Sequence, residues 1–90
     1  MDHHCIKATV NGRVQGVGYR HAVSKRAREA NVAGHVSNLA DGSVEVIACG
    51  EQEKIDRLIE WLWHGPPAAQ VTHVQIEEIA WCEYTNFTTG

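Results

Sequence analysis

The spacing of apolar residues changes along the chain in a fixed order, and this order constrains the fold more than any other feature. Between residues 5 and 11 apolar and polar side chains alternate, which is the two-residue period of a half-buried strand. Residues 19–30 place apolar side chains three or four positions apart, the period of an amphipathic helix. The same change recurs later, where a strand at 44–49 precedes a helix at 52–63.

The remaining segments complete the pattern. Residues 32–39 form a further expected strand, and Asp41-Gly42 after it is a dipeptide typical of hairpin turns. A Gly-Pro-Pro run ends the second helix, and residues 71–79 again alternate as a strand. A short last strand is expected around Phe87.

The resulting order is strand, helix, strand, strand, helix, strand. Two helices on one face of an antiparallel sheet bury these apolar stripes economically, which favours the ferredoxin-like α+β two-layer sandwich. A chain of 90 residues can form one hydrophobic core but not two lobes with a cleft between them. We therefore expect a single domain over residues 1–90.

Charge and hydropathy exclude several classes of function. Eight Lys and Arg against eleven Asp and Glu give a formal net charge of −3, which counts against nucleic-acid binding driven by bulk charge. No apolar run approaches the roughly 20 residues that cross a bilayer. The first residues, Met1–His4, do not resemble a signal peptide. We expect a cytoplasmic monomer without nucleic-acid or membrane partners.

The cysteines and histidines do not follow the spacing of a metal site. Cys5, Cys49 and Cys82 lie far apart, and no Cys-x-x-Cys or His-Glu-x-x-His pattern is present, so we expect no metal. The adjacent His3 and His4 are interpreted as a solvated N-terminal tail. Antiparallel pairing of the first and third strands would set Cys5 opposite Cys49. A Cys5–Cys49 disulfide is thus one hypothesis, and two reduced thiols in a reducing cytoplasm are the alternative.

The densest chemical signal is the segment Gly12–Arg20, with the sequence GRVQGVGYR, between the first strand and the first helix. Its three glycines permit backbone angles that let successive amides face one ligand, and the helix N-terminus adds partial positive charge. Arg20 offers a guanidinium that binds phosphate through two parallel hydrogen bonds. The segment lacks the lysine and hydroxyl of a P-loop. It predicts a site for a small oxyanion, with a plain tight connection as the alternative.

Two segments together resemble the signatures of the acylphosphatase family. The first is Gly12–Arg20, and the second is Gly34–Val44, with the sequence GHVSNLADGSV, followed by Gly50. Gly65-Pro66 resembles a later region of the family. The two motifs stand in the family's order and at its distance, and the resemblance spans nearly the whole chain. The family has the ferredoxin-like fold, in agreement with the order of strands and helices.

The resemblance implies an enzyme that hydrolyses the carboxyl–phosphate bond of small acyl phosphates to carboxylate and phosphate, with no metal and no other cofactor. By position, Arg20 resembles the phosphate-binding arginine, and Asn38 resembles the asparagine that positions the attacking water. His35 and Ser37 depart from the family pattern, and we expect them to tune packing or substrate access. The backbone amides expected to cradle the phosphate are those of Gln15, Gly16, Val17, Gly18 and Tyr19.

Other interpretations of single residues remain open on the sequence. One is that Asn38 braces the hairpin that turns at Asp41-Gly42. Another is that Arg20 pairs with the carboxylate of Gly90. The three tryptophans of the chain, at positions 61, 63 and 81, are assigned to the core or its edge.

Two alternative functions also remain. The first is a noncatalytic ferredoxin-like module that binds a small anion or RNA, although the first and third strands offer no exposed aromatic residue for base stacking. The second is a piece resembling the acylphosphatase-like domain of larger maturation proteins that handle carbamoyl phosphate. Nothing in the chain predicts a pocket that selects one acyl group.

Overall fold

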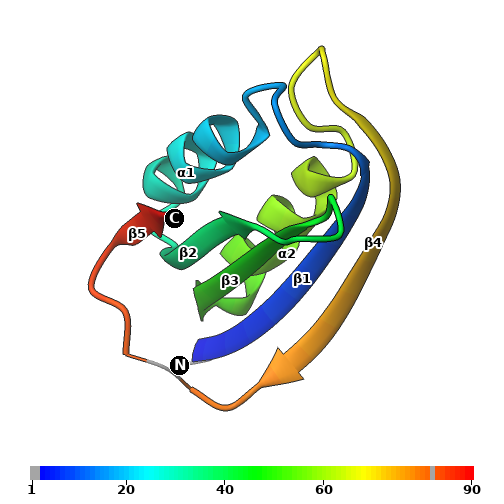
Figure 1. Cartoon of the computed structure of the whole chain (residues 1–90). Coiled ribbons are helices and arrows are strands. Elements are labelled where there is room, and N and C mark those ends of the chain that lie inside the picture. The colour runs from blue at the N-terminus through cyan, green and yellow to red at the C-terminus, as the bar shows by residue number, and fades with distance from the viewer. Residues whose placement is uncertain (1–2, 82) are drawn as a thin grey trace.

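The computed structural model describes residues 3–81 and 83–90 as five strands and two helices (Figure 1). All five strands belong to one sheet with the order β4-β1-β3-β2-β5. The elements in chain order are β1 (His3–Arg13), α1 (Tyr19–Glu29), β2 (Ala33–Asn38), β3 (Val44–Glu51), α2 (Gln52–Leu62), β4 (Gln70–Ile79) and β5 (Phe87–Thr89).

The architecture is the predicted ferredoxin-like α+β sandwich, with one addition. Four strands pair antiparallel, as β1 with β3, β1 with β4 and β2 with β3. The short β5 pairs with β2 in parallel, so the complete sheet is mixed. This last strand brings the end of the chain beside α1 and β2 (Figure 1).

One core lies between the sheet and the two helices. Alternation along β1 and β3 sends Ala8, Val10 and Val46 into this core, as expected for half-buried strands. The buried apolar residues of α1 are Tyr19, Val23 and Ala27, and those of α2 are Ile55, Leu58 and Leu62. In the part of the chain that the structure describes, no helix is long and apolar enough to cross a membrane.

Cys5 and Cys49 face each other across the β1–β3 pair, in the register expected from the sequence. Their Cα atoms lie 4.1 Å apart, both side chains are buried, and the structure joins them in a disulfide. Cys82 lies outside the described residues. A thiol count on unreduced, denatured protein tests the oxidised state, with one free thiol expected and three thiols contradicting the bridge.

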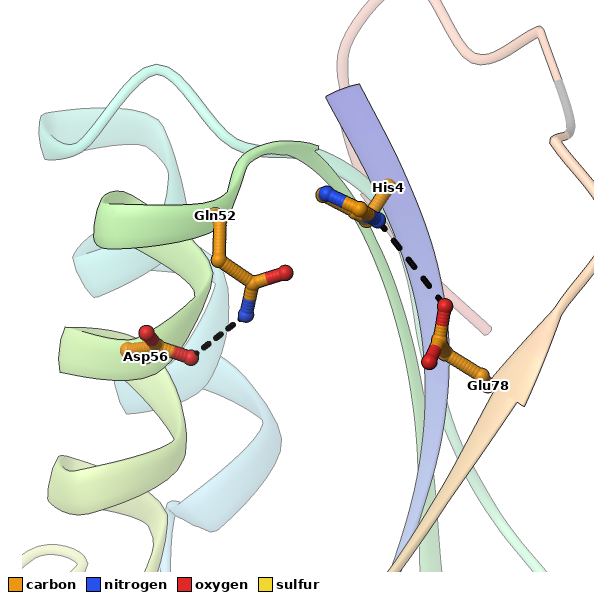
Figure 2. A network of polar contacts seen from close by, with 4 residues as sticks. All are labelled: His4, Gln52, Asp56 and Glu78. Carbon is orange, nitrogen blue, oxygen red and sulfur yellow. Dashed lines mark hydrogen bonds and ion pairs between the residues drawn. The ribbon is translucent and has the colours of Figure 1, made fainter. Parts of the chain in front are cut away.

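The interpretation of His3 and His4 as a solvated tail is wrong, because both residues lie in β1. This strand extends to the start of the described chain because β3 offers it partners as far as Glu51. Nδ1 of His4 lies 3.8 Å from a carboxylate oxygen of Glu78 on β4, and Figure 2 shows the two side chains facing each other. In the same view, Nε2 of Gln52 donates a 2.7 Å hydrogen bond to Oδ1 of Asp56, four residues later on α2.

The tryptophans divide between the core edge and the surface. Trp61 packs against the core, with its ring stacked on Tyr19 at 6.0 Å between centroids. Trp63 and Trp81 are 47% and 53% exposed, so their assignment to the core or its edge is wrong. Each lies just after the end of an element, Trp63 after α2 and Trp81 after β4, so neither belongs to the apolar face that the element packs on the core.

Candidate active site

The loop between β1 and α1 takes its shape from two glycines. Gly16 and Gly18 have φ angles of 74° and 79°, in the left-handed region that residues with a Cβ rarely adopt. Gly18 is also the N-cap of α1, whose first turn has no acidic residue and no capping side chain. The start of α1 therefore keeps its partial positive charge and its free amides available to an anion.

A cleft of about 330 Å³ opens beside this loop. Its walls come from the loop, from α1, from the end of β2 and from β5. The lining residues are Val14, Gly16, Gly18, Tyr19, Arg20, His21, Ser24, Arg28, Asn38 and Thr89. The structure thus brings Arg20 and Asn38, the two predicted catalytic residues, into one cleft with three of the five predicted cradle residues. Gln15 and Val17 are not among those that line it.

The guanidinium groups of Arg20 and Arg28 both reach the C-terminal strand. Nη1 of Arg20 donates to an oxygen of Gly90, which is the contact expected from the alternative that Arg20 pairs with Gly90. Arg28 donates from Nε and Nη2 to the carbonyl oxygen of Phe87, at 3.3 and 3.0 Å. A guanidinium carries five N–H groups, so Arg20 keeps further donors for an anion while it contacts Gly90.

Asn38 is exposed at the end of β2, opposite Val44 of β3. Within residues 3–81 and 83–90 its side-chain amide makes no hydrogen bond to protein. The alternative that Asn38 braces the hairpin is therefore not what the structure contains. The amide is instead free to bind a ligand or water in the cleft.

Other side chains hold the hairpin turn. Oδ1 of Asp41 accepts hydrogen bonds from the backbone N–H and the hydroxyl of Ser43, at 3.0 and 2.5 Å. These two bonds hold the pKa of the Asp41 carboxyl below its usual range. From the other side, Nε2 of Gln15 donates to the carbonyl oxygens of Leu39 and Ser43, at 2.8 and 2.9 Å.

Tyr19 anchors the first turn of α1. Its buried hydroxyl donates a 2.8 Å hydrogen bond to the carbonyl oxygen of Leu62, at the end of α2. Burial raises the pKa of this hydroxyl, so it stays a neutral donor. The side chain of Tyr19 therefore orients the helix start, and only its backbone amide is available to the predicted cradle.

His35 and Ser37, which depart from the family pattern, lie on β2 beside the C-terminal strand. Nδ1 of His35 and the hydroxyl of Thr88 are 2.6 Å apart. An added Cβ on Gly90 would lie 3.3 Å from the Cβ of Ser37, so the two residues are close neighbours. His35 therefore contacts β5, and Ser37 lies beside the residue that follows β5.

Sequence reasoning missed several parts of the cleft. Ser24 and Arg28 follow Arg20 at intervals of four residues, which places all three on one face of α1. That spacing was the signal that could have identified them. Thr89 reaches the cleft only because β5 pairs with β2, and no local pattern predicts that pairing. Among the described residues, no three His, Cys, Asp or Glu side chains gather as a metal site would require.

Comparison with known proteins decides the family. The family model named acylphosphatase matches residues 6–89. The chain belongs to the acylphosphatase family. The predicted family and the predicted fold are both confirmed, and the chain is an enzyme of the acylphosphatase type.

Individual acylphosphatases agree with this assignment over almost their full length. The acylphosphatase of Chromohalobacter salexigens is 54% identical over 78 residues, which cover 87% of each chain. The solved acylphosphatase of Coxiella burnetii superposes with a TM-score of 0.95 at 47% identity, covering 99% of this chain and 94% of that one. The solved acylphosphatase of Bacillus subtilis gives a TM-score of 0.92 at 33% identity, covering 96% and 97%.

Proposed function

We propose that this acylphosphatase hydrolyses the carboxyl–phosphate bond of small acyl phosphates in the cleft beside α1, without a metal ion. The observation that carries the proposal is the shared lining of that cleft. Arg20, Asn38 and the glycines of the loop meet at the uncapped N-terminus of α1.

The phosphate group is the part of the substrate that this cleft is suited to hold. The backbone amides of residues 15–19 and the N-terminus of α1 present donors and partial positive charge to its oxygens. Arg20 adds a full charge and parallel N–H groups. Since charge in the loose transition state lies on the equatorial phosphoryl oxygens, these fixed donors also lower the barrier.

Asn38 has a different part in the proposed reaction. Its amide holds a water in line with the phosphorus, because it can both accept from and donate to that water. The water oxygen forms the new bond to phosphorus while the carboxylate leaves with the electrons of the broken P–O bond. One water proton passes to a phosphate oxygen, so the products are a carboxylate and dihydrogen phosphate. A carboxylate leaves readily at neutral pH, so no general acid is needed.

Hydrolysis of benzoyl phosphate, followed in the ultraviolet with a chelator present, tests this function. We expect turnover by the wild type, and in Asn38→Ala a kcat lower by about 100- to 1000-fold with inhibition by inorganic phosphate unchanged. Asn86→Ala, an exposed asparagine outside the cleft lining, is the matched control and should keep full activity.

Two outcomes would contradict the proposal in different ways. Loss of phosphate affinity in Asn38→Ala at an unchanged kcat would remove the water-positioning role. No turnover by folded wild-type protein would favour the noncatalytic anion-binding or RNA-binding module instead, and a phosphate titration would then separate those two.

The physiological setting is also a proposal. We infer that one domain over residues 1–90 acts as a monomer in the cytoplasm, with a small acyl phosphate as its partner and no nucleic acid. The residues of the central strands that alternate with the core residues support the absence of a nucleic-acid partner, because none of them is aromatic and bases could not stack on them. These residues are Lys7 and Thr9 on β1 and Glu45 and Ile47 on β3. Light scattering of the purified protein and fractionation of cells that express it test the monomer and the location.

A further inference from the structure

The side chain of Gln15 joins two segments that the proposed mechanism requires to act together. Gln15 opens the phosphate loop, and its Nε2 donates to the carbonyl oxygens of Leu39 and Ser43 in the β2–β3 hairpin. Both bonds have ordinary lengths, 2.8 and 2.9 Å, and the side chain is half-buried. An amide nitrogen has two hydrogens, so this contact uses both of them.

The two acceptors stand at the base of the hairpin turn. The carbonyl of Ser43 also accepts a 2.8 Å bond from the N–H of Leu39, and the carbonyl of Leu39 accepts a 3.2 Å bond from Gly42. Gln15 therefore binds the pair of residues that closes the turn. Because Leu39 directly follows Asn38, this contact sets the distance between the phosphate loop and the backbone of Asn38.

The turn does not need Gln15 in order to form. The side chain of Asp41 holds Ser43 from within the turn, and β2 pairs with β3 from Ala33 to Asn38. Removing the Gln15 amide should thus leave a folded hairpin whose position relative to the phosphate loop is less well defined. That is the behaviour of a positioning residue and not of a residue that the fold requires.

We propose that the Gln15 side chain is a positioning residue that holds Asn38 in register with the phosphate bound by the loop. The inference rests on the proposed function, since it assigns a task to Gln15 only if Asn38 positions the attacking water. The resemblance to the family assigned Gln15 only a backbone amide in the phosphate cradle. The inference adds a role for its side chain.

The test is a double-mutant cycle of Gln15→Met and Asn38→Ala, measured as kcat on benzoyl phosphate and as inhibition by inorganic phosphate. Methionine keeps the length of the side chain, lacks both donors and adds no charge near the phosphate. We expect Gln15→Met to lower kcat by about 10- to 100-fold, because small misplacements of a catalytic group are costly, while phosphate inhibition stays unchanged. Gln75→Met, an exposed glutamine of β4, is the matched control and should change neither quantity.

The cycle also separates positioning from general damage. If Gln15 acts through Asn38, Gln15→Met should cause little further loss of kcat in a chain that already carries Asn38→Ala. An equal loss of kcat with and without Asn38, or weaker phosphate inhibition in proportion to the lost rate, would overturn the inference. If Gln15→Met does not fold, Gln15→Asn keeps the amide but shortens its reach, and the same expectations apply.

Failure of this inference and failure of the proposed function give different results. A wild type without turnover, or Asn38→Ala with full kcat, contradicts the proposed function. A strong effect of Asn38→Ala together with full kcat in Gln15→Met contradicts only the role of Gln15.

Discussion

The two helices have the same length and cover the same face of the sheet, yet they differ in what they bury and what they expose. α2 buries Ile55, Leu58 and Leu62, which are large apolar side chains. Beyond Tyr19 at its start, α1 buries only the smaller Val23, Ser24 and Ala27. The narrow buried stripe of α1 leaves much of its surface for polar side chains.

Those polar side chains make α1 the cationic helix of an acidic protein. Four of the eight Lys and Arg residues lie on it, namely Arg20, Lys25, Arg26 and Arg28. α1 packs beside β2 and β5, next to the cleft, whereas α2 packs against the central strands β1 and β3 (Figure 1). The proposed chemistry therefore depends on α1 and much of the core packing on α2, so substitutions in the two helices should separate activity from stability.

The largest effect should come from α1. Arg20→Ala removes the one side-chain cation proposed to bind the phosphate, so we expect kcat/KM for benzoyl phosphate to fall by at least about 1000-fold. Thermal unfolding should change little, because Arg20 is only half-buried. Lys25→Ala, on the same helix but outside the cleft lining, should keep its activity. An equal loss in Lys25→Ala would show that the general charge of α1, and not Arg20, carries binding.

The opposite result is expected from α2. Ile55 is fully buried, and Ile55→Ala should lower the free energy of unfolding by about 2–5 kcal/mol. Urea unfolding measures this loss, and kcat at a temperature well below the transition should stay near that of the wild type. Arg57→Ala, which breaks only an exposed ion pair with Glu53, is the control and should cost no more than about 0.5 kcal/mol. A folded Ile55→Ala variant with strongly reduced kcat would contradict the expectation that α2 supports stability and not activity.

Tyr19 links the two helices, so Tyr19→Phe should have an intermediate effect. The change leaves the carbonyl of Leu62 without its hydroxyl partner and should cost about 1–3 kcal/mol of stability. Because burial raises the pKa of Tyr19, the wild type should lose stability as the pH rises above about 10, where the unfolded chain ionises first. Urea titrations between neutral and alkaline pH should show a shallower decline for Tyr19→Phe, and parallel curves would contradict this cause.

The smallest effect should come from the hairpin, which belongs to neither helix. The pKa of Asp41 is lowered, so its contribution to stability is present at neutral pH and is lost as the pH falls below about 4, through the lowered value. Asp41→Asn should remove this acid-sensitive part, so its stability should lie slightly below that of the wild type at neutral pH and should fall less in acid. Urea midpoints measured from neutral to acidic pH test the expectation, and an unchanged acid slope would count against it.

The sequence predicted what depends on local patterns. The strands and helices follow from the periods of their apolar residues, and their order favoured one sheet topology. The position of Arg20 after a glycine-rich turn and of Asn38 before a hairpin turn followed from two short motifs. These motifs placed both residues near turns, and the fold places both at one cleft.

Contacts between distant segments were not predictable in the same way. β5 has three residues and joins the sheet only through β2, so no period in the sequence could show that it runs parallel or that Thr89 reaches the cleft. The bond from Gln15 to the hairpin depends on the distance between two loops that the fold alone sets. The exposure of Trp63 depends on where α2 ends. The sequence alone does not distinguish a large apolar residue just after a helix from one inside the helix that packs in the core.

The disulfide has a topological consequence for the part of the chain that lines the cleft. Cys5 and Cys49 enclose the loop, α1, β2 and the hairpin, so while oxidised they make a covalent ring that contains both Arg20 and Asn38. A protease that cuts the backbone once at the exposed hairpin would open this ring without releasing either fragment. The fragment before the cut carries both Arg20 and Asn38, and it would stay joined through sulfur to the fragment that holds β3, α2, β4 and β5.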